Sequence, residues 1–348
     1  MPSSPTGGIA RNLKEMRRVF RIIDRSPRAT LAIFIGAYLI VLGTIAALQH
    51  YQYKTQGWDL GIFSQLFWNT LHGRFMQTSI EDTPLHLGRH MSPGLIFLLP
   101  GYALFPSPYF LLIVQTIALA LGAWPLYLFA QHVLHDIRRS LLVATAYLLY
   151  PSLHSINLYD FHEIAFLPPL IIAGWYFFET RRRGWMAVCL MLGASMREDA
   201  ALMIGIAGLA MMLRSPAKHA PEEQNNNHCV GLIVAACAFA WFTISVLALM
   251  PDLGGGLYNL DRYTALGGTP SEIFRTLLTR PDRIITELLT PHKLAYLALI
   301  LLPATFLPLF SLQGIILTAP GILENALTNY SWQFSTLFHY DADARGMV

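Results

Sequence analysis

Charged residues are scarce in this sequence. Asp, Glu, Lys and Arg make up 13% of the 348 residues, whereas hydrophobic residues make up 54% and the mean hydropathy is +0.44. A soluble domain carries about 25% charged residues, so this chain has too few charges to cover a surface that faces water. The composition therefore predicts an integral membrane protein, with the lipid bilayer as its partner.

Cysteine is also scarce, and motifs for phosphate-rich cofactors are missing. The three cysteines, Cys189, Cys229 and Cys237, lie inside or at the ends of apolar runs, which excludes a disulfide framework and favours packing roles. No Gly-rich phosphate loop, dinucleotide fingerprint or nucleic-acid motif occurs in the sequence. We therefore expect no nucleotide cofactor, no redox cofactor and no nucleic-acid partner.

Long apolar runs, in contrast, recur along the chain. The first, 29–49, follows seven basic residues in 11–28 and exceeds the roughly 7–15 apolar residues of a cleavable signal peptide. It is predicted to be an uncleaved span that follows a basic cytoplasmic segment, residues 1–28. Because a spanning helix needs roughly 20 apolar residues, the later runs predict an all-α, polytopic transmembrane bundle. They lie at 108–131, 140–152, 164–178, 184–213, 229–250, 293–310 and 312–327.

The run 184–213 is interrupted by Arg197-Glu198-Asp199. One long helix would place three ionised groups near the middle of the bilayer, at ~2.5–3.5 kcal/mol each, so we expect two short spans joined by an outer hairpin. With this division, residues 29–342 are predicted to form a single transmembrane domain of about eight to nine spans.

Three outer loops result, at 50–107, 153–163 and 251–292. In the first, apolar residues at helical spacing after Trp58 predict a helix in the plane of the interface, and the short run 94–105 predicts a juxtamembrane helix. Lys and Arg cluster in the N-terminal segment and the inner loops, which by the positive-inside rule places the N-terminus in the cytoplasm. The acidic motifs then lie on the outer side.

Several stretches carry a resemblance to a known family. They are WDLGIFSQLFWNTLHG, LGRHMSPGLIFLLPGYALFPSP, the LLYPS and DFHE pair, MREDAAL and RYTALGGTP. Over about residues 30 to 342 the chain resembles the predicted membrane proteins of domain-of-unknown-function family 2079. Its members usually continue past a histidine-tyrosine motif, matched here by His339-Tyr340, into more spans. The resemblance therefore implies a truncated chain with a short tail, 343–348.

That family is in turn similar to membrane glycosyltransferases of the C-type fold (GT-C). These enzymes use polyprenyl-phosphate sugars and keep a catalytic carboxylate in the first extracytoplasmic loop. The resemblance implies a GT-C-like bundle in a bacterial cytoplasmic (inner) membrane, which transfers a sugar from a polyprenyl-phosphate donor to an extracytoplasmic acceptor. Two alternatives from other classes are a transporter or flippase of a lipid-linked or small anionic solute, and a non-catalytic envelope protein.

Asp59 is the candidate catalytic base, because it opens the first outer loop next to aromatic residues. It could take the proton from an acceptor hydroxyl as that oxygen attacks the anomeric carbon with inversion. One carboxylate can suffice, since a phosphate leaving group needs no protonated acid. The alternative is that Asp59 is the N-cap of the interfacial helix.

Asp160, His162 and Glu163 are candidates for positioning the acceptor or donor, for holding a divalent cation, or for serving as the base in place of Asp59. Asp160 and Glu163 would share a face if the segment is helical, and a polar helix start is the alternative. His90 could face the same cavity. A metal bound between His86 and His90 is disfavoured by the intervening Gly88.

Arg197 is the candidate phosphate-binding residue, because a guanidinium pairs with phosphate oxygens in a fork geometry. The alternative is an internal ion pair with Glu198 or Asp199. Arg262 and Tyr263, in the third outer loop, form a second candidate pair for the phosphate.

Overall fold

The computed structural model describes residues 26–214, 221–257 and 260–335. Within these ranges the chain is helical and contains no strand, which confirms the all-α prediction. Three parts of the sequence prediction fall outside them: nearly all of the basic segment 1–28, the His339-Tyr340 motif and the tail 343–348.

Three helices are long and apolar enough to cross a membrane by themselves. They are Pro27–Tyr51, Pro108–Leu134 and Gln224–Asp252, and two bent helix pairs raise the number to five if each pair counts as one span. The described residues thus hold three to five candidate spans rather than eight to nine. The difference arises because several apolar helices have only 12 to 15 residues, fewer than the roughly 20 that cross a bilayer unaided.

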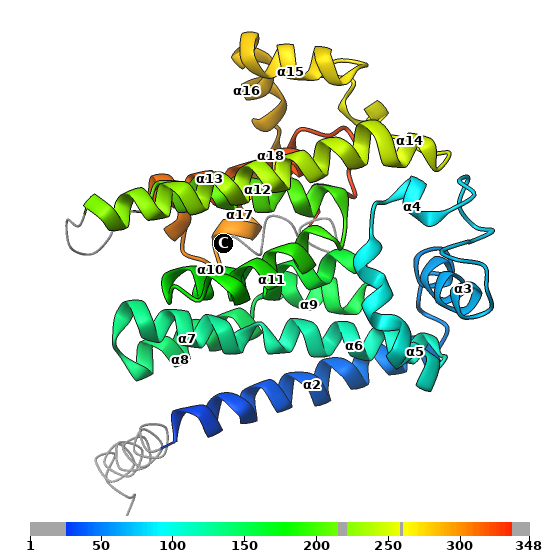
Figure 1. Ribbon diagram of the computed structural model, residues 1–348, viewed down its shortest axis with the longest axis horizontal. Helices are drawn as coiled ribbons and strands as arrows, with labels where there is room; N and C mark the ends of the chain where they lie inside the picture. Colours follow the sequence, from blue (N-terminus) through cyan, green and yellow to red (C-terminus); the bar gives the residue numbers. More distant parts are fainter. Residues whose placement is uncertain (1–25, 215–220, 258–259, 336–348) are drawn as a thin grey trace, which may run out of the picture.

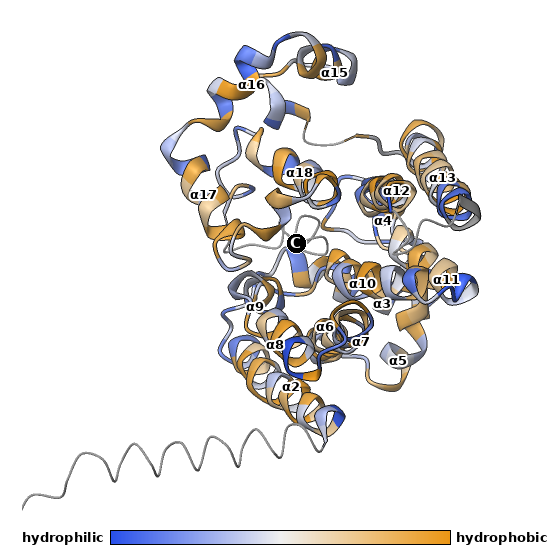
Figure 2. Ribbon diagram, turned by 90° about the vertical axis from the view of Figure 1, so that its left-hand side faces the viewer, coloured by the Kyte–Doolittle hydropathy of each residue, from blue (hydrophilic) through white to orange (hydrophobic). Residues whose placement is uncertain are grey.

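Most helices of the bundle run side by side along the long axis of the molecule, and the end-on view shows hydrophobic residues along most of them (Figures 1 and 2). The bundle consists of α2 (Pro27–Tyr51), α6 (Pro108–Leu121), α7 (Ala123–Leu134), α8 (Ile137–Leu148), α9 (Pro151–Leu158), α10 (Leu167–Glu179), α11 (Arg183–Ala194), α12 (Glu198–Met212), α13 (Pro221–Ile244), α18 (Leu312–Ala326) and α17 (Pro291–Leu301), which runs across the long axis.

Small residues let α12 and α13 approach closely. A Cβ on Gly208 would lie 2.6 Å from the backbone nitrogen of Ala235, and one on Gly231 would lie 2.5 Å from the carbonyl oxygen of Gly208. Such contacts are typical of helix pairs in membranes, where close van der Waals packing supplies much of the attraction.

The first outer loop gathers at one end of the bundle (Figure 1). It contains α3 (Asp59–Leu71), α4 (His86–Arg89), the 3-10 helix η1 (Pro93–Leu98) and α5 (Leu99–Leu104). The predicted amphipathic helix after Trp58 is therefore confirmed as a helix. Its apolar face, with Phe63 and Phe67, is buried against Tyr102 and Phe161, so α3 is fixed to the bundle by packing.

The run 184–213 forms two helices, as predicted. α11 ends at Ala194, α12 begins at Glu198, and the charged residues lie at the break. The first outer loop is held against this break, because the backbone nitrogen of Gly94 donates to the carbonyl oxygen of Ser195 at 2.8 Å. A Cβ on Gly94 would lie 2.5 Å from the Ser195 hydroxyl oxygen, so this approach requires glycine.

The third outer loop touches the first. After α13 come the π-helical segment η3 (Ser245–Leu249), α14 (Met250–Asp252), the 3-10 helix η4 (Leu260–Tyr263), α15 (Pro270–Thr279) and α16 (Pro281–Leu288). Gly255 lies on Gly88, and a Cβ at position 255 would be 1.7 Å from the Gly88 carbonyl oxygen. The loops that carry the candidate polar residues are thus in direct contact.

Candidate functional site

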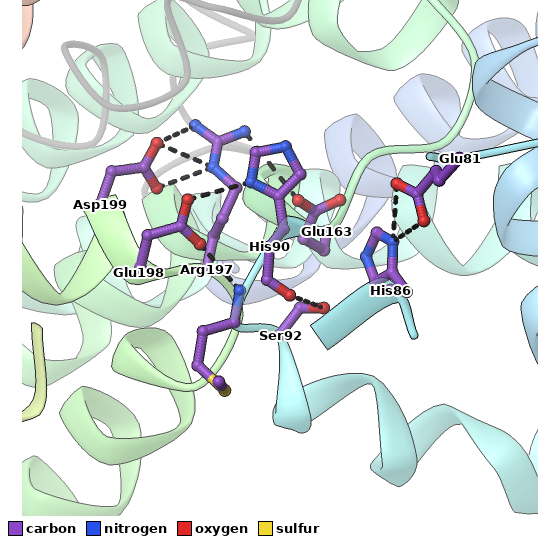
Figure 3. A network of polar contacts seen from close by, with 9 residues as sticks. Glu81, His86, His90, Ser92, Glu163, Arg197, Glu198 and Asp199 are labelled. Carbon is purple, nitrogen blue, oxygen red and sulfur yellow. Dashed lines mark hydrogen bonds and ion pairs between the residues drawn. The ribbon is translucent and has the colours of Figure 1, made fainter. Parts of the chain in front are cut away.

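Polar residues from four separate segments meet at this end of the bundle. Asp59 begins α3, His90 follows α4, residues 160–163 lie between α9 and η2 (Glu163–Phe166), and Arg197 precedes α12. Figure 3 shows His90, Glu163 and Arg197 side by side, together with Glu198 and Asp199. Segments that are more than a hundred residues apart in sequence therefore form one polar cluster.

Asp59 is the first residue of α3, and the N-cap is Trp58, which makes no side-chain capping bond. The N-cap interpretation of Asp59 is therefore wrong. Its Oδ2 lies 3.9 Å from Nε2 of His162, and its side chain is 26% exposed. Burial, together with the smaller effect of the nearby Glu163 carboxylate, raises the pKa of Asp59 to about 6. A carboxylate that is partly accessible and more basic than usual can exchange protons near neutral pH.

Asp160 lies in a non-helical stretch and has a left-handed backbone, with a φ of +69°. Because the segment is not helical at Asp160, Asp160 and Glu163 do not share a helical face. Its Oδ2 accepts a hydrogen bond from the backbone nitrogen of Gln56 at 2.7 Å. Burial raises the pKa of Asp160 to about 7; the hydrogen bond from Gln56 opposes this shift, and the charge of Asp59 adds to it.

Gln115, in the middle of α6, holds this stretch in place. Its fully buried amide donates from Nε2 to the carbonyl oxygens of Ile156 at 3.1 Å and Asp160 at 2.6 Å. Its Oε1 accepts from the backbone nitrogen of His162 at 2.8 Å. Gln115 belongs to none of the motifs from which the site was predicted. The available signal was a lone amide inside an apolar run, a position that is costly unless the amide has partners.

His162 and Glu163 are buried between Asp59 and Arg197. Burial lowers the pKa of His162 to about 3, and the positive charges of Arg197 and His90 contribute, so the imidazole is neutral. Glu163 is 2% exposed; its Oε1 lies 4.0 Å from Nη1 of Arg197, and Oε2 has no hydrogen-bond partner among the described residues. Arg197 therefore supplies a cation that forms an ion pair with the Glu163 carboxyl group.

Arg197 makes an internal ion pair, the alternative to a role in phosphate binding, and its partner is Asp199. Its Nε donates to both carboxylate oxygens of Asp199, at 2.7 and 2.8 Å, and Nη2 donates to Oδ2. Glu198 instead accepts from Nδ1 of His90 at 3.0 Å and from the backbone nitrogen of Met91 at 2.9 Å. Burial lowers the pKa of His90, but the contact with Glu198 outweighs burial and the pKa is raised overall.

His86 and His90 each contact a different carboxylate. The rings are 6.1 Å apart between centroids, but Nδ1 of His86 lies 2.9 Å from Oε2 of Glu81, whereas His90 contacts Glu198. Figure 3 shows both pairs. Among residues 26–214, 221–257 and 260–335, no group of three or more His, Cys, Asp or Glu side chains is arranged to hold a metal ion.

Arg262 and Tyr263 contact α18 and the segment that follows it. The Arg262 guanidinium lies 4.2 Å over the ring of Tyr330, and Tyr263 donates to the carbonyl oxygen of Glu324 at 3.1 Å. Burial raises the pKa of Tyr263, and the charges of Glu324 and, more weakly, Asp199 also raise it. Tyr263 therefore lies within electrostatic reach of the Arg197–Asp199 pair.

Acidic groups outnumber basic groups in the cluster. The carboxylates belong to Asp59, Asp160, Glu163, Glu198 and Asp199, and the cations are Arg197 and a protonated His90. Like charges in a buried site raise each other's pKa values, which agrees with the shifts of Asp59 and Asp160. The cluster can thus take up protons near neutral pH.

A family model described as "Predicted membrane protein (DUF2079)" matches residues 49–343. No curated protein and no solved structure matches the chain.

Proposed function

The chain belongs to the DUF2079 family of predicted membrane proteins, and on this premise we propose that it is a membrane glycosyltransferase of the GT-C type. The proposed reaction transfers a sugar from a polyprenyl-phosphate donor to an extracytoplasmic acceptor. The observation that supports it most is the meeting of Asp59, with its raised pKa, and Arg197 in one polar cluster at one end of the bundle.

Asp59 acts as the general base in this proposal. Its carboxylate takes the proton from the acceptor hydroxyl while that oxygen forms a bond to the anomeric carbon, and the bond from this carbon to the phosphate oxygen breaks. Polyprenyl phosphate leaves with the electron pair of the broken bond, and the configuration at the anomeric carbon is inverted. A base with a pKa of about 6 is ionised at neutral pH and still basic enough to accept the proton.

The remaining candidates position the reactants. Asp160, His162, Glu163 and His90 surround Asp59 and Arg197, and they orient the acceptor and the sugar. Arg197 binds the leaving phosphate and shares its guanidinium between the phosphate and Asp199. Arg262 and Tyr263 contribute to phosphate binding from the side of the cluster on which Asp199 lies.

The proposed orientation follows from the charges of the sequence. The N-terminus lies in the cytoplasm, and the polar cluster lies at the extracytoplasmic face of a bacterial cytoplasmic membrane. The positive-inside rule supports this arrangement.

The test uses the full chain in lipid nanodiscs with radiolabelled undecaprenyl-phosphate glucose and undecaprenyl-phosphate arabinose. Transfer is measured as label that leaves the lipid phase in the presence of a panel of sugar acceptors. We expect Asp59→Asn to reduce the rate by roughly 100-fold or more, while the exposed control Asp252→Asn has no effect. The wild-type rate should rise as the pH passes 6. Full activity of Asp59→Asn, or no turnover of any lipid-linked sugar, would contradict the proposal.

A second function, proton-coupled transport of a small anionic solute, is favoured by the raised pKa values of Asp59 and Asp160. Proteoliposomes with an imposed pH gradient distinguish the two functions. Uptake of labelled inorganic phosphate that depends on the gradient, and that Asp160→Asn abolishes, would support transport. The convergence of the polar loops weighs against a non-catalytic envelope protein.

A further inference from the structure

A cleft with mostly apolar walls lies between two groups of helices. Its volume is about 710 Å³, and its walls come from α7, α8 and α10 on one side and from residues 303–317, which lead from α17 into α18, on the other. The end-on view places α8 and α10 on one side and α17 and α18 on the other (Figure 2). Ligand cavities in proteins measure about 300–1,000 Å³ and combine apolar walls with a few polar groups, so this cleft has the size and lining of a binding site.

The cleft is open to the surroundings of the bundle. Leu142 on α8 and Leu307 on the opposite wall are 69% and 68% exposed, although both line the cleft. Two of its walls belong to candidate membrane spans, because α7 is part of Pro108–Leu134 and α8 is part of a bent pair that passes as one span. The opening therefore lies in the part of the molecule that a bilayer surrounds, where acyl chains are the apolar molecules at hand.

Polar groups gather at one end of the cleft. Arg214, Ser311 and Gln313 line it there, and Arg214 is the only charged residue among the described residues of the lining. Nε2 of Gln313 donates to the carbonyl oxygen of Ala210 at 3.4 Å. The start of α18 thus lies beside the last turn of α12, and Arg214 follows that turn.

The guanidinium of Arg214 has donors to spare. Its Nε donates to Oε1 of Glu179 at 2.7 Å, and its side chain is 34% exposed. Its Nη1 and Nη2 have no hydrogen-bond partner in the part of the chain that the structure describes. The pair with Glu179 therefore orients the guanidinium and leaves its outer edge able to bind an anion.

The start of α18 favours an anion independently of Arg214. Ser311 is its N-cap, and the hydroxyl of Ser311 accepts from the backbone nitrogen of Gly314 at 2.9 Å. The other N–H groups of the first turn have no partner within a helix, and they carry partial positive charge. Two different features that bind anions thus lie at the same end of an apolar cleft.

We propose that the cleft binds one anionic phospholipid of the surrounding membrane. An acyl chain of this lipid occupies the apolar part of the cleft. Its phosphate oxygens accept hydrogen bonds from Nη1 and Nη2 of Arg214, whose fork matches a phosphate, and lie at the positive end of α18. Basic pockets between membrane helices are a recognised means of binding anionic lipid headgroups.

This lipid is a different molecule from the sugar donor. Arg197 precedes α12 and Arg214 follows it, and the 15 residues of the helix separate its two ends by roughly 22 Å. A phosphate bound at Arg214 is therefore remote from the polar cluster around Asp59. The inference does not depend on the reaction catalysed, because it rests on the cleft and on Arg214 alone.

The experiment is native mass spectrometry of the full chain in detergent, titrated with dioleoyl phosphatidylglycerol, with dioleoyl phosphatidylcholine or with undecaprenyl phosphate. We expect one phosphatidylglycerol to bind more tightly than any phosphatidylcholine, whose choline brings a cation next to Arg214. Arg214→Gln should weaken this binding about tenfold, the effect of losing a hydrogen bond to a charged group. The matched control is Arg139→Gln, since the side chain of Arg139 is 73% exposed and lies outside the cleft.

A second pair of variants tests the apolar part without altering any charge. Ala146 lines the cleft, whereas Ala187 is exposed on α11 outside it. Ala146→Trp should remove the tight binding of phosphatidylglycerol by filling the cleft, and Ala187→Trp should leave it unchanged. Folding of all four variants is checked by circular dichroism.

Three results would overturn the proposal. Binding of phosphatidylglycerol that survives Ala146→Trp would show that the acyl chain lies elsewhere. Equal weakening by Arg214→Gln and Arg139→Gln would reduce the effect to a general attraction of anionic lipid to basic residues. Displacement of phosphatidylglycerol by tighter binding of undecaprenyl phosphate would assign the cleft to a polyprenyl chain instead of a phospholipid.

Discussion

Replacement of Gln115 by leucine is expected to destabilise the protein strongly. Leucine has a similar size and suits an apolar helix, so packing of α6 should survive. The change removes three hydrogen bonds, however, and leaves the carbonyls of Ile156 and Asp160 and the backbone nitrogen of His162 without their side-chain partner.

The magnitude follows from the number of buried groups. An unsatisfied buried polar group costs about 1–3 kcal/mol. Some relaxation and water entry will recover part of this, so we expect Gln115→Leu to lower the free energy of unfolding by about 3 kcal/mol. The matched control is Thr116→Val. Thr116 is equally buried, but its hydroxyl donates only to the carbonyl of Leu112 in the same helix, so its loss should cost about 1 kcal/mol or less.

The assay is reversible unfolding in mixed micelles with increasing mole fraction of SDS, followed by circular dichroism. If Gln115→Leu unfolds at the same point as Thr116→Val, the side chain of Gln115 does not hold residues 156–162 and the reasoning is refuted.

Three further variants test the electrostatics and packing of the same end. Burial raises the pKa of Asp160 above its value in the unfolded chain, so ionisation of Asp160 destabilises the fold as the pH rises to about 7. Asp160→Asn should therefore increase the Tm more at pH 8 than at pH 4. An equal change in Tm at the two pH values would contradict this prediction. The pKa of His90 is raised in the folded protein, so protonated His90 stabilises the fold at pH values below its pKa in the unfolded chain, and this stabilisation is lost as the pH rises through its pKa in the folded protein. His90→Gln should therefore lower the Tm more at pH 5 than at pH 9. The reverse order would argue against the pair of His90 with Glu198. Gly255→Ala should lower the free energy of unfolding by about 2 kcal/mol, because a Cβ at position 255 meets the backbone of Gly88. The control is Gly256→Ala, since a Cβ on Gly256 meets nothing within 4 Å. Equal free energies of unfolding for these two variants would show that the two loops are not in contact.

Helical periodicity and the cost of buried charge were sufficient to predict several elements. The spacing of Leu60, Phe63 and Phe67 predicted α3, and the charges at 197–199 predicted the break between α11 and α12. The meeting of the polar loops was also expected, because the positive-inside rule placed them on one side.

Other features depend on tertiary contacts that local sequence does not reveal. The pairing of His90 with Glu198 joins residues 108 positions apart, and the left-handed backbone of Asp160 is held by Gln115 from another helix. The predicted eight to nine spans are not confirmed, because hydropathy shows apolar runs but does not show where a helix ends. α10, for example, ends after 13 residues.

The central claim is that Asp59 and Asp160 belong to one buried acidic cluster beside Arg197. Infrared difference spectra recorded during a pH titration measure it directly, because protonation of each carboxylate gives a carbonyl band that the Asp59→Asn and Asp160→Asn variants assign. We predict apparent pKa values of about 6 for Asp59 and about 7 for Asp160, and a lower value for Asp160 once Asp59 is replaced. Two independent titrations near 4, with no effect of one variant on the other residue, would contradict the account.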